Sequence, residues 1–139
     1  MPKSLSHVVV FTDDLDAMLR FLTDVAKVPA VNPYRTEAED VHELFGWPLE
    51  HAAVRGAFVG EGPGGVDILE IPEALRGTVP PGVRLLAVVN RDAAAAGAAA
   101  QAAGFPVRGP FATTAATGAP MSLVEVVAGG VAFELVQFG

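Results

Sequence analysis

The residues best suited to do chemistry are one histidine and two glutamates in apolar, strand-like segments. Glu134 lies in the middle of the run Val131–Phe138, and Glu70 lies near the end of the similar run Val66–Ile71. An ionised carboxylate is costly in apolar surroundings unless it is paired, hydrogen-bonded or bound to a metal. Glu134 is therefore expected either on the wet face of its strand or in a functional site. His7 lies in a third segment of strand character, and its imidazole can ligate a metal or move a proton.

These segments belong to two similar series of elements, of which the first fills the N-terminal half. A β-branched strand over residues 5–11 leads into Thr12-Asp13-Asp14, which is helix-capping chemistry. Apolar residues then recur at spacings of three and four, which predicts a helix that Pro29 ends. A strand over residues 30–35, a short helical stretch over 36–45 and a hairpin of strands 52–59 and 66–71 complete a βαβββ order.

The second series repeats that order. It has a strand over residues 83–89, an alanine-rich helix over 93–103 that begins at the cap Asp92, and a short strand over 105–108. A loop is predicted over residues 109–120, followed by strands 121–128 and 131–138 around the Gly129–Gly130 turn. The sequence therefore predicts an α+β fold made of two tandem βαβββ modules in a single domain, 1–139. Module one covers residues 4–71, a proline-rich linker 72–82, and module two 83–139.

The amino-acid composition excludes several kinds of partner and site. A chain of 139 residues with 51% hydrophobic content can bury one core. The net charge of −7 argues against nucleic acid or an anionic membrane as partner, which leaves small molecules and proteins. The absence of cysteine excludes disulfides, cysteine zinc sites and thiol nucleophiles. No export signal or membrane-spanning run is recognisable, so a cytoplasmic location is expected.

The arrangement resembles the vicinal oxygen chelate superfamily, the group of glyoxalases, bleomycin-resistance proteins and extradiol dioxygenases. The resemblance rests on His7 within Ser-His-Val-Val-Val, the Thr-Asp-Asp-Leu helix entry, the Leu-Glu-Ile strand end, the second βαβββ series and the closing Phe-Glu-Leu-Val. It implies curved mixed sheets that form one open cleft, and a homodimer.

The resemblance also implies a site. In that family, inward side chains of the first and last strands of each module bind a divalent metal, which here would be Zn, Ni, Fe, Mn or Mg held by His7, Glu70 and Glu134. Leu85 falls where many members have a second histidine, and leucine cannot ligate. The cofactor expectation is therefore either such a metal or none. Glu70 and Glu134 are also the expected catalytic groups, since two carboxylates in one cleft can divide acid and base roles.

Three further residues are candidates for substrate binding. Arg55, in the middle of a strand, is either an exposed strand charge or a clamp for a substrate carboxylate or phosphate. Trp47 lies in an irregular stretch that suits a lid or a dimer contact. Leu85 would make the cleft more apolar.

Two functions remain open at this stage. The first is a glyoxalase-like lyase or isomerase that uses a divalent metal to stabilise an enediolate-type intermediate. The alternative is a metal-free protein of the bleomycin-resistance type that binds a small molecule. A ring-cleaving dioxygenase is disfavoured because Leu85 removes one of the two histidines that such chemistry usually needs. The resemblance thus favours an enzyme, with a binding protein as the alternative.

Overall fold

The element order repeats one βαβββ series, as the sequence predicts. The computed structural model describes residues 6–48, 53–60, 64–114 and 118–139. They form two compact units: a first unit, Val8–Arg84, and a second unit made of Leu85–Gly139 with the described residues of Met1–His7. The α+β class and the duplicated βαβββ order are confirmed. No helix of the described part is long and apolar enough to cross a membrane.

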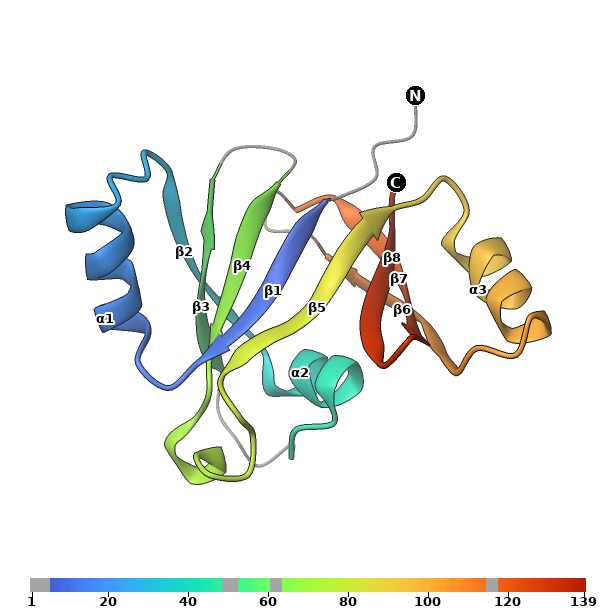
Figure 1. Ribbon diagram of the computed structural model, residues 1–139, viewed down its shortest axis with the longest axis horizontal. Helices are drawn as coiled ribbons and strands as arrows, with labels where there is room; N and C mark the ends of the chain where they lie inside the picture. The colour runs from blue at the N-terminus through green and yellow to red at the C-terminus, as the bar shows by residue number, and fades with distance from the viewer. Residues whose placement is uncertain (1–5, 49–52, 61–63, 115–117) are drawn as a thin grey trace. The chain divides into compact units, whose positions relative to one another are not determined.

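The first series carries one insertion, a helix between its second and third strands (Figure 1). Its elements are β1 (His7–Thr12), α1 (Leu15–Arg20), the π-helical turn η1 (Phe21–Val25), β2 (Val31–Thr36), α2 (Ala38–Phe45), β3 (Val54–Val59), β4 (Gly65–Glu70) and the 3₁₀ turn η2 (Glu73–Leu75). The second series comprises β5 (Gly82–Val89), α3 (Ala93–Ala102), β6 (Val107–Thr114), β7 (Pro120–Ala128) and β8 (Val131–Phe138).

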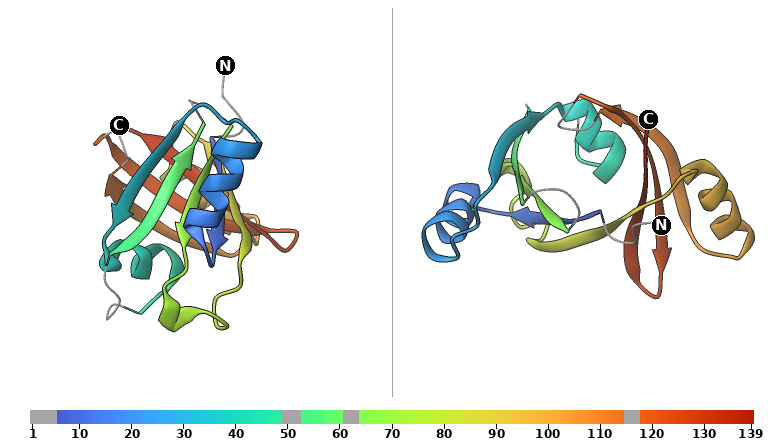
Figure 2. Two further views of the ribbon diagram at one scale, coloured as in Figure 1. Left: turned by 90° about the vertical axis from the view of Figure 1, so that its left-hand side faces the viewer. Right: turned by 90° about the horizontal axis from the view of Figure 1, so that it is seen from above.

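The core of the first unit lies between α1 and one face of a sheet with strand order β2-β3-β4-β1. The carboxylate of Asp14 accepts a 2.9 Å hydrogen bond from the backbone N–H of Ala17, which caps α1 as predicted. Leu15 of the helix packs with Ile68 of β4 and with Ala57 and Val59 of β3. Figure 2, left, looks onto α1 with these strands behind it. The face that Ile68 occupies is therefore the helix-covered face.

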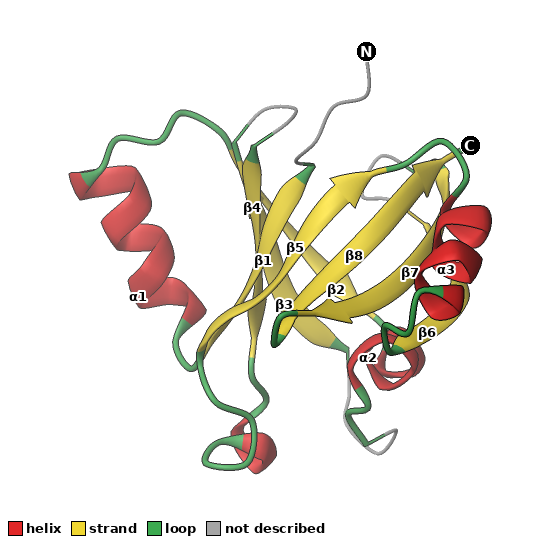
Figure 3. Ribbon diagram, turned by 45° about the vertical axis from the view of Figure 1, so that its right-hand side comes forward, coloured by secondary structure: helices red, strands yellow, loops and turns green. Residues whose placement is uncertain are grey.

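The second unit has the equivalent arrangement, with strand order β5-β8-β7-β6 and α3 against the sheet (Figure 3). Strand β5 pairs in parallel with β8, and β7 pairs antiparallel with both β8 and β6. Ala93 of α3 packs on Val124 and Val126 of β7. The small side chains of α3 allow this close approach, so the alanine-rich composition reflects packing.

The structure differs from the sequence prediction in two places, the end of one strand and the geometry of one helix. The predicted loop over residues 109–120 begins with six residues of strand, since β6 continues to Thr114. Pro110 argued against a strand here, because proline has no N–H for a ladder hydrogen bond. A proline is tolerated in β6 because β6 is the last strand in the order and its register shifts between Arg108 and Phe111. The first helix also changes from α to π geometry after Arg20. Residues 61–63 of the predicted hairpin turn lie outside the described residues.

Candidate functional site

Glu70 and Arg55, predicted separately as catalytic and substrate-binding residues, bind each other. Arg55 donates from Nε to Oε1 of Glu70 at 3.0 Å and from Nη2 to Oε2 at 2.8 Å. The backbone N–H of Leu15 donates to Oε2 of the same carboxylate at 2.9 Å, and Asp16 lies 3.3 Å from the guanidinium. The hydrogen bonds from Arg55 hold the pKa of Glu70 below its ordinary value, and the Leu15 N–H adds to this effect. Glu70 therefore lies on the helix-covered face and joins β4 to the start of α1.

A different carboxylate of β4 lies on the opposite face. Successive side chains of a strand alternate between its faces, so Asp67 points away from α1 while Ile68 points towards it. The hydroxyl of Tyr34, in β2, donates a hydrogen bond to the Asp67 carboxylate. This pair was missed in the sequence, although the alternation around Asp67 was a signal that could have revealed its face.

Burial gives this pair unusual titration properties. It raises the pKa of Asp67 to about 6, although the hydrogen bond from Tyr34 acts in the opposite direction. Burial, together with the negative charge of Asp67, also raises the pKa of Tyr34. The Asp67 carboxyl therefore changes charge close to neutral pH, within the range useful for proton transfer.

A glycine makes room for this contact. Gly56 of β3 is the cross-strand partner of Tyr34, and a Cβ there would lie 2.6 Å from the Cζ atom of the Tyr34 ring. That distance is shorter than real Cβ contacts allow, so the ring lies over Gly56 only because the side chain is absent. The lack of a side chain at Gly56 thus lets Tyr34 reach across the sheet to Asp67.

Glu134 and Leu85 share a face in the second unit. Ala87 of β5 is in register with Glu134 of β8, and Leu85 lies two residues before Ala87, so all three side chains are on one face. That face is opposite to the one that carries Leu135 against α3. Leu85 is 1% exposed and Glu134 is 8% exposed. The structure therefore brings together these two sequence candidates, one apolar and one acidic.

Glu134 has a second carboxylate beside it. Glu125 of β7 is its direct antiparallel partner and is 9% exposed. The guanidinium of Arg108, in β6, lies 3.6 Å from the Glu125 carboxylate. Directly opposed residues of an antiparallel pair lie on the same face about 5 Å apart at Cβ. The second unit thus holds a buried pair of acidic side chains with a cation at one end.

His7 is half-buried, and its Nδ1 lies 3.0 Å from the hydroxyl of Ser6. Burial lowers the pKa of its imidazole, which favours the neutral, ligand-competent form. The described residues nevertheless contain no group of three or more His, Asp and Glu side chains placed to hold a metal ion. Glu70 is occupied by Arg55, and Leu85 offers no donor atom. The donor set of the described residues therefore does not fit the implied divalent metal.

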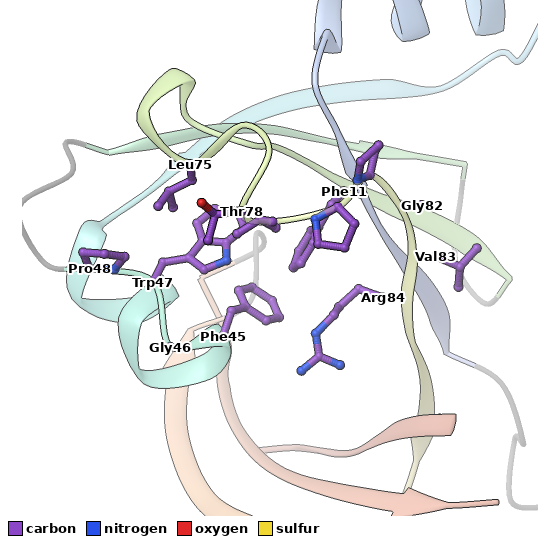
Figure 4. Close-up of a pocket in the computed structure, with 13 residues that line it drawn as sticks. Phe11, Phe45, Gly46, Trp47, Pro48, Leu75, Thr78, Gly82, Val83 and Arg84 are labelled. Carbon is purple, nitrogen blue, oxygen red and sulfur yellow. The ribbon is translucent and has the colours of Figure 1, made fainter. Parts of the chain in front are cut away.

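Trp47, the third substrate-binding candidate, lines a pocket of about 590 Å³ in the first unit. Figure 4 shows the aromatic side chains of this pocket with Arg84 beside them. The lining residues are Phe11, residues 45–48, Leu75 and residues 78–84. Most of them are apolar and come from the end of α2 and from the segment between β4 and β5. A pocket of this size and character can hold a small organic molecule.

The aromatic side of the pocket is built from two separate segments. The ring centroid of Phe11 lies 5.1 Å from that of Phe45 and 5.0 Å from that of Trp47. Nδ1 of His42 donates to the backbone carbonyl of Trp47 at 2.5 Å, and Gly46 ends α2 with a positive φ of 76°. These contacts fix the turn that carries Phe45 and Trp47.

The repeated βαβββ elements define an α+β protein, and its first unit contains a pocket lined mainly by apolar side chains. The sequence profile of the Glyoxalase/Bleomycin resistance protein/Dioxygenase superfamily matches residues 4–119, and the chain belongs to this family. A comparison with curated protein sequences gave no match.

Solved structures with the same fold include several methylmalonyl-CoA epimerases. A variant of the Streptomyces coelicolor epimerase in complex with 2-nitronate-propionyl-CoA is 19% identical, with a TM-score of 0.71 over 99% of this chain and 98% of that chain. The Mycobacterium tuberculosis epimerase is 18% identical, with a TM-score of 0.66 over 96% and 87%. A hypothetical protein from Bacillus halodurans C-125 is 16% identical, with a TM-score of 0.66 over 97% and 94%. At these identities the likeness establishes the fold.

Proposed function

We propose that this chain binds a small organic molecule and does so without a divalent metal, as in the bleomycin-resistance branch of its family. The observation that carries the proposal is Leu85, an apolar side chain 1% exposed on the same strand face as Glu134. A histidine at this place is what the family resemblance implies for a metal site. The aromatic pocket of the first unit supports the small-molecule part of the proposal.

The metal-dependent lyase or isomerase is less well supported by the donor groups. Catalytic sites for ions such as zinc usually use three protein ligands. Of the positions that the resemblance implies, Leu85 has no donor atom and Glu70 is bound by Arg55 and the backbone of Leu15. His7 and Glu134 alone would leave such an ion weakly held.

Metal content and melting temperature test this proposal. Protein purified without chelator is expected to contain far less than one equivalent of any divalent metal, and its melting temperature should not change on treatment with EDTA or on addition of Zn²⁺, Ni²⁺ or Mn²⁺. A panel of small apolar acids and thioesters should contain compounds that raise the melting temperature, because a ligand that binds only the folded state stabilises it. One equivalent of tightly bound metal, lost with stability in EDTA, would overturn the proposal.

A metal-free isomerase is the second candidate, and the buried pair Glu125 and Glu134 favours it. Two neighbouring carboxyl groups can divide acid and base roles, and such a pair can take a proton from a carbon next to a carbonyl and return it. Solved relatives hold methylmalonyl-CoA and 2-nitronate-propionyl-CoA, so a CoA thioester is a reasonable first substrate. Methylmalonyl-CoA incubated in D₂O should gain deuterium at its α-carbon, and Glu134→Gln should abolish the exchange. Absence of exchange with the native protein would exclude this reaction for this substrate.

We further propose a homodimer, which the family resemblance supports, and a cytoplasmic location. Sedimentation equilibrium at micromolar concentration should give twice the chain mass of 14.3 kDa. A mass of 14.3 kDa at all concentrations would contradict the dimer. Cell fractionation with an antibody against the chain tests the location.

A further inference from the structure

We propose that the pocket of the first unit recognises a flat, apolar carboxylate, with its ring system against Phe11, Phe45 and Trp47 and its carboxylate on Arg84. This inference rests on the proposed small-molecule function and assigns a ligand class and a binding residue to it. The pocket is separate from the strand face of the second unit that carries Glu125 and Glu134.

The aromatic side of the pocket selects for a flat apolar body. Phe11 and Phe45 meet edge to face at an interplanar angle of 87°, and Trp47 is tilted by 54° against Phe11 and by 45° against Phe45. Aromatic side chains offer a large contact area and favour stacked or edge contacts with another ring. A third ring system can therefore contact the accessible parts of these side chains better than a branched alkyl chain can.

Several side chains that line the pocket are already held in place before a ligand binds. Trp47 is 4% exposed, and its backbone carbonyl is held by His42. Leu75, also buried, and Pro80 and Pro81 line the same pocket from the segment between β4 and β5. Proline fixes its own φ, so this side of the pocket loses little conformational entropy when a ligand binds.

The charge of the pocket selects for an anion. Among its described lining residues, Arg84 is the one charged side chain, and no carboxylate is among them. The guanidinium carbon of Arg84 lies 5.9 Å from the centroid of the Phe45 ring. Figure 4 shows these two side chains close to each other. This cation–π contact holds the positive charge next to the aromatic side, and a guanidinium can bind a carboxylate through two parallel hydrogen bonds. A carboxylate attached directly to a ring system matches this spacing of apolar body and charge.

Calorimetric titration with biphenyl-4-carboxylate and its neutral amide tests the inference on the full chain. The carboxylate should bind about tenfold to a hundredfold more tightly than the amide, because hydrogen bonds to charged groups are worth about 1.5–3 kcal/mol. Arg84→Gln should remove this preference and leave the affinity for the amide unchanged. Arg76→Gln is the matched control, since Arg76 is exposed in the same segment and does not line the pocket.

Trp47 gives an independent readout because it is the only tryptophan of the chain. Binding should change its fluorescence with the same midpoint as the calorimetric titration, and Phe45→Leu should weaken both ligands without altering the preference for the carboxylate. Circular dichroism verifies that each variant is folded, and Arg84→Lys, which keeps the charge, should retain part of the preference.

The inference is overturned if the carboxylate and the amide bind alike, or if Arg84→Gln and Arg76→Gln have the same effect. If the chain contains no metal and binds other compounds but not biphenyl-4-carboxylate, this inference is wrong and the proposed function is still supported. A chain that needs a metal for stability but binds the carboxylate through Arg84 would overturn the proposed metal-free function and support the inference about the pocket.

Discussion

Asp67 and Glu70 are two acidic residues of one strand with opposite environments. They are separated by an odd number of positions, so their side chains lie on opposite faces of β4. Glu70 meets a guanidinium and a backbone N–H, which stabilise its charge. Asp67 is half-buried against the phenol of Tyr34, and this desolvation disfavours its charge. The environments of these two carboxyl groups therefore shift their pKa values in opposite directions, upwards for Asp67 and downwards for Glu70.

Asp67 should make the folded state less stable at neutral pH. Its pKa is about 6 in the folded protein against an ordinary value of 3.8, so the folded state binds the proton more tightly. The stabilisation from this proton is complete below about pH 4 and is lost as pH rises through 6. Asp67→Asn should thus be more stable than the native protein at pH 7 by about 2 to 3 kcal/mol, and the gap should close towards pH 4. Urea unfolding at several pH values measures it.

Tyr34→Phe supplies the second arm of this experiment. The Tyr34 hydroxyl lowers the Asp67 pKa, so its loss should move the upper end of the pH window to higher values. Asp13→Asn, at an exposed position, controls for the loss of a carboxylate. A stability gap between Asp67→Asn and the native protein that is independent of pH would show that Asp67 does not titrate in this range.

At the scale of elements, the Arg55–Glu70 pair attaches α1 to β4. Glu70→Gln should destabilise the protein at pH 7 by about 1 to 3 kcal/mol, because it weakens hydrogen bonds to a charged group and leaves a guanidinium with less compensation. The pKa of Glu70 is lowered in the folded state, so its contribution is present above the ordinary value of 4.5 and is lost as pH falls through the folded-state pKa. The stability loss should therefore shrink in acid.

Thermal unfolding of Glu70→Gln and of Glu73→Gln, both at several pH values, measures the effect. Glu73 is exposed and begins the turn that follows β4, so its substitution should change stability little. Equal losses in the two variants would mean that the attachment of α1 contributes nothing specific.

The contact between α3 and β7 depends on one glycine. A Cβ at Gly97 would lie 2.7 Å from Cγ1 of Val124, a side chain that is itself buried. Gly97→Ala should destabilise the native protein by about 1 kcal/mol, since overpacking outweighs the better helix propensity of alanine. In a Val124→Ala background the same change should instead stabilise by about 1 kcal/mol. A double-mutant cycle from chemical denaturation measures the sign change, and the same sign in both backgrounds would rule out the steric explanation.

The elements themselves were largely predictable from local signals. Asp14 and Asp92 both cap helices where capping chemistry was expected, and the apolar spacing placed the helix stripe against the sheet. The end of β6 was not predictable from local signals. Pro110 normally interrupts a strand because it lacks an N–H, but in an outermost strand that N–H has no partner strand to bind. Strand ends of this kind depend on which strands become neighbours in the sheet, and the strand order cannot be predicted from one sequence.

The candidate site was predicted only in part, for a similar reason. Residue type identified Arg55, Glu70 and Glu134 as candidate site residues, but the partner of each side chain is set by its strand face and by the strand register. Glu70 shares its face with Ile68, and this apolar neighbour already indicated the covered side of the sheet. The contact between Tyr34 and Asp67 spans 33 residues and depends on the missing side chain at Gly56, so no local pattern contains it. The metal role of His7, Glu70 and Glu134 is an untested prediction, and the ion pair of Glu70 with Arg55 counts against it.

At the scale of the whole molecule, one substitution tests how the two βαβββ series correspond. Leu85→His would place an imidazole on the strand face that carries Glu134. If Leu85 is the counterpart of a family ligand, the variant should bind Ni²⁺ or Zn²⁺ at least about tenfold more tightly than the native chain, since one added metal–ligand bond is worth more than 1.4 kcal/mol. Calorimetry on chelator-treated protein measures the difference. Leu86→His, on the other face of β5, is the control, and equal gains in both variants would refute the correspondence.

The prolines of the outermost strands limit how copies of this chain can associate. Strands β2 and β6 end the strand order of the described residues, and each carries a proline within it, Pro33 and Pro110. A proline offers no N–H to a strand added from outside, and Arg35 adds an exposed charge to β2. Growth of the sheet from one molecule into the next is therefore discouraged at both ends. A homodimer should join through helices or sheet faces, and the same feature should protect a concentrated solution of the protein from fibre formation.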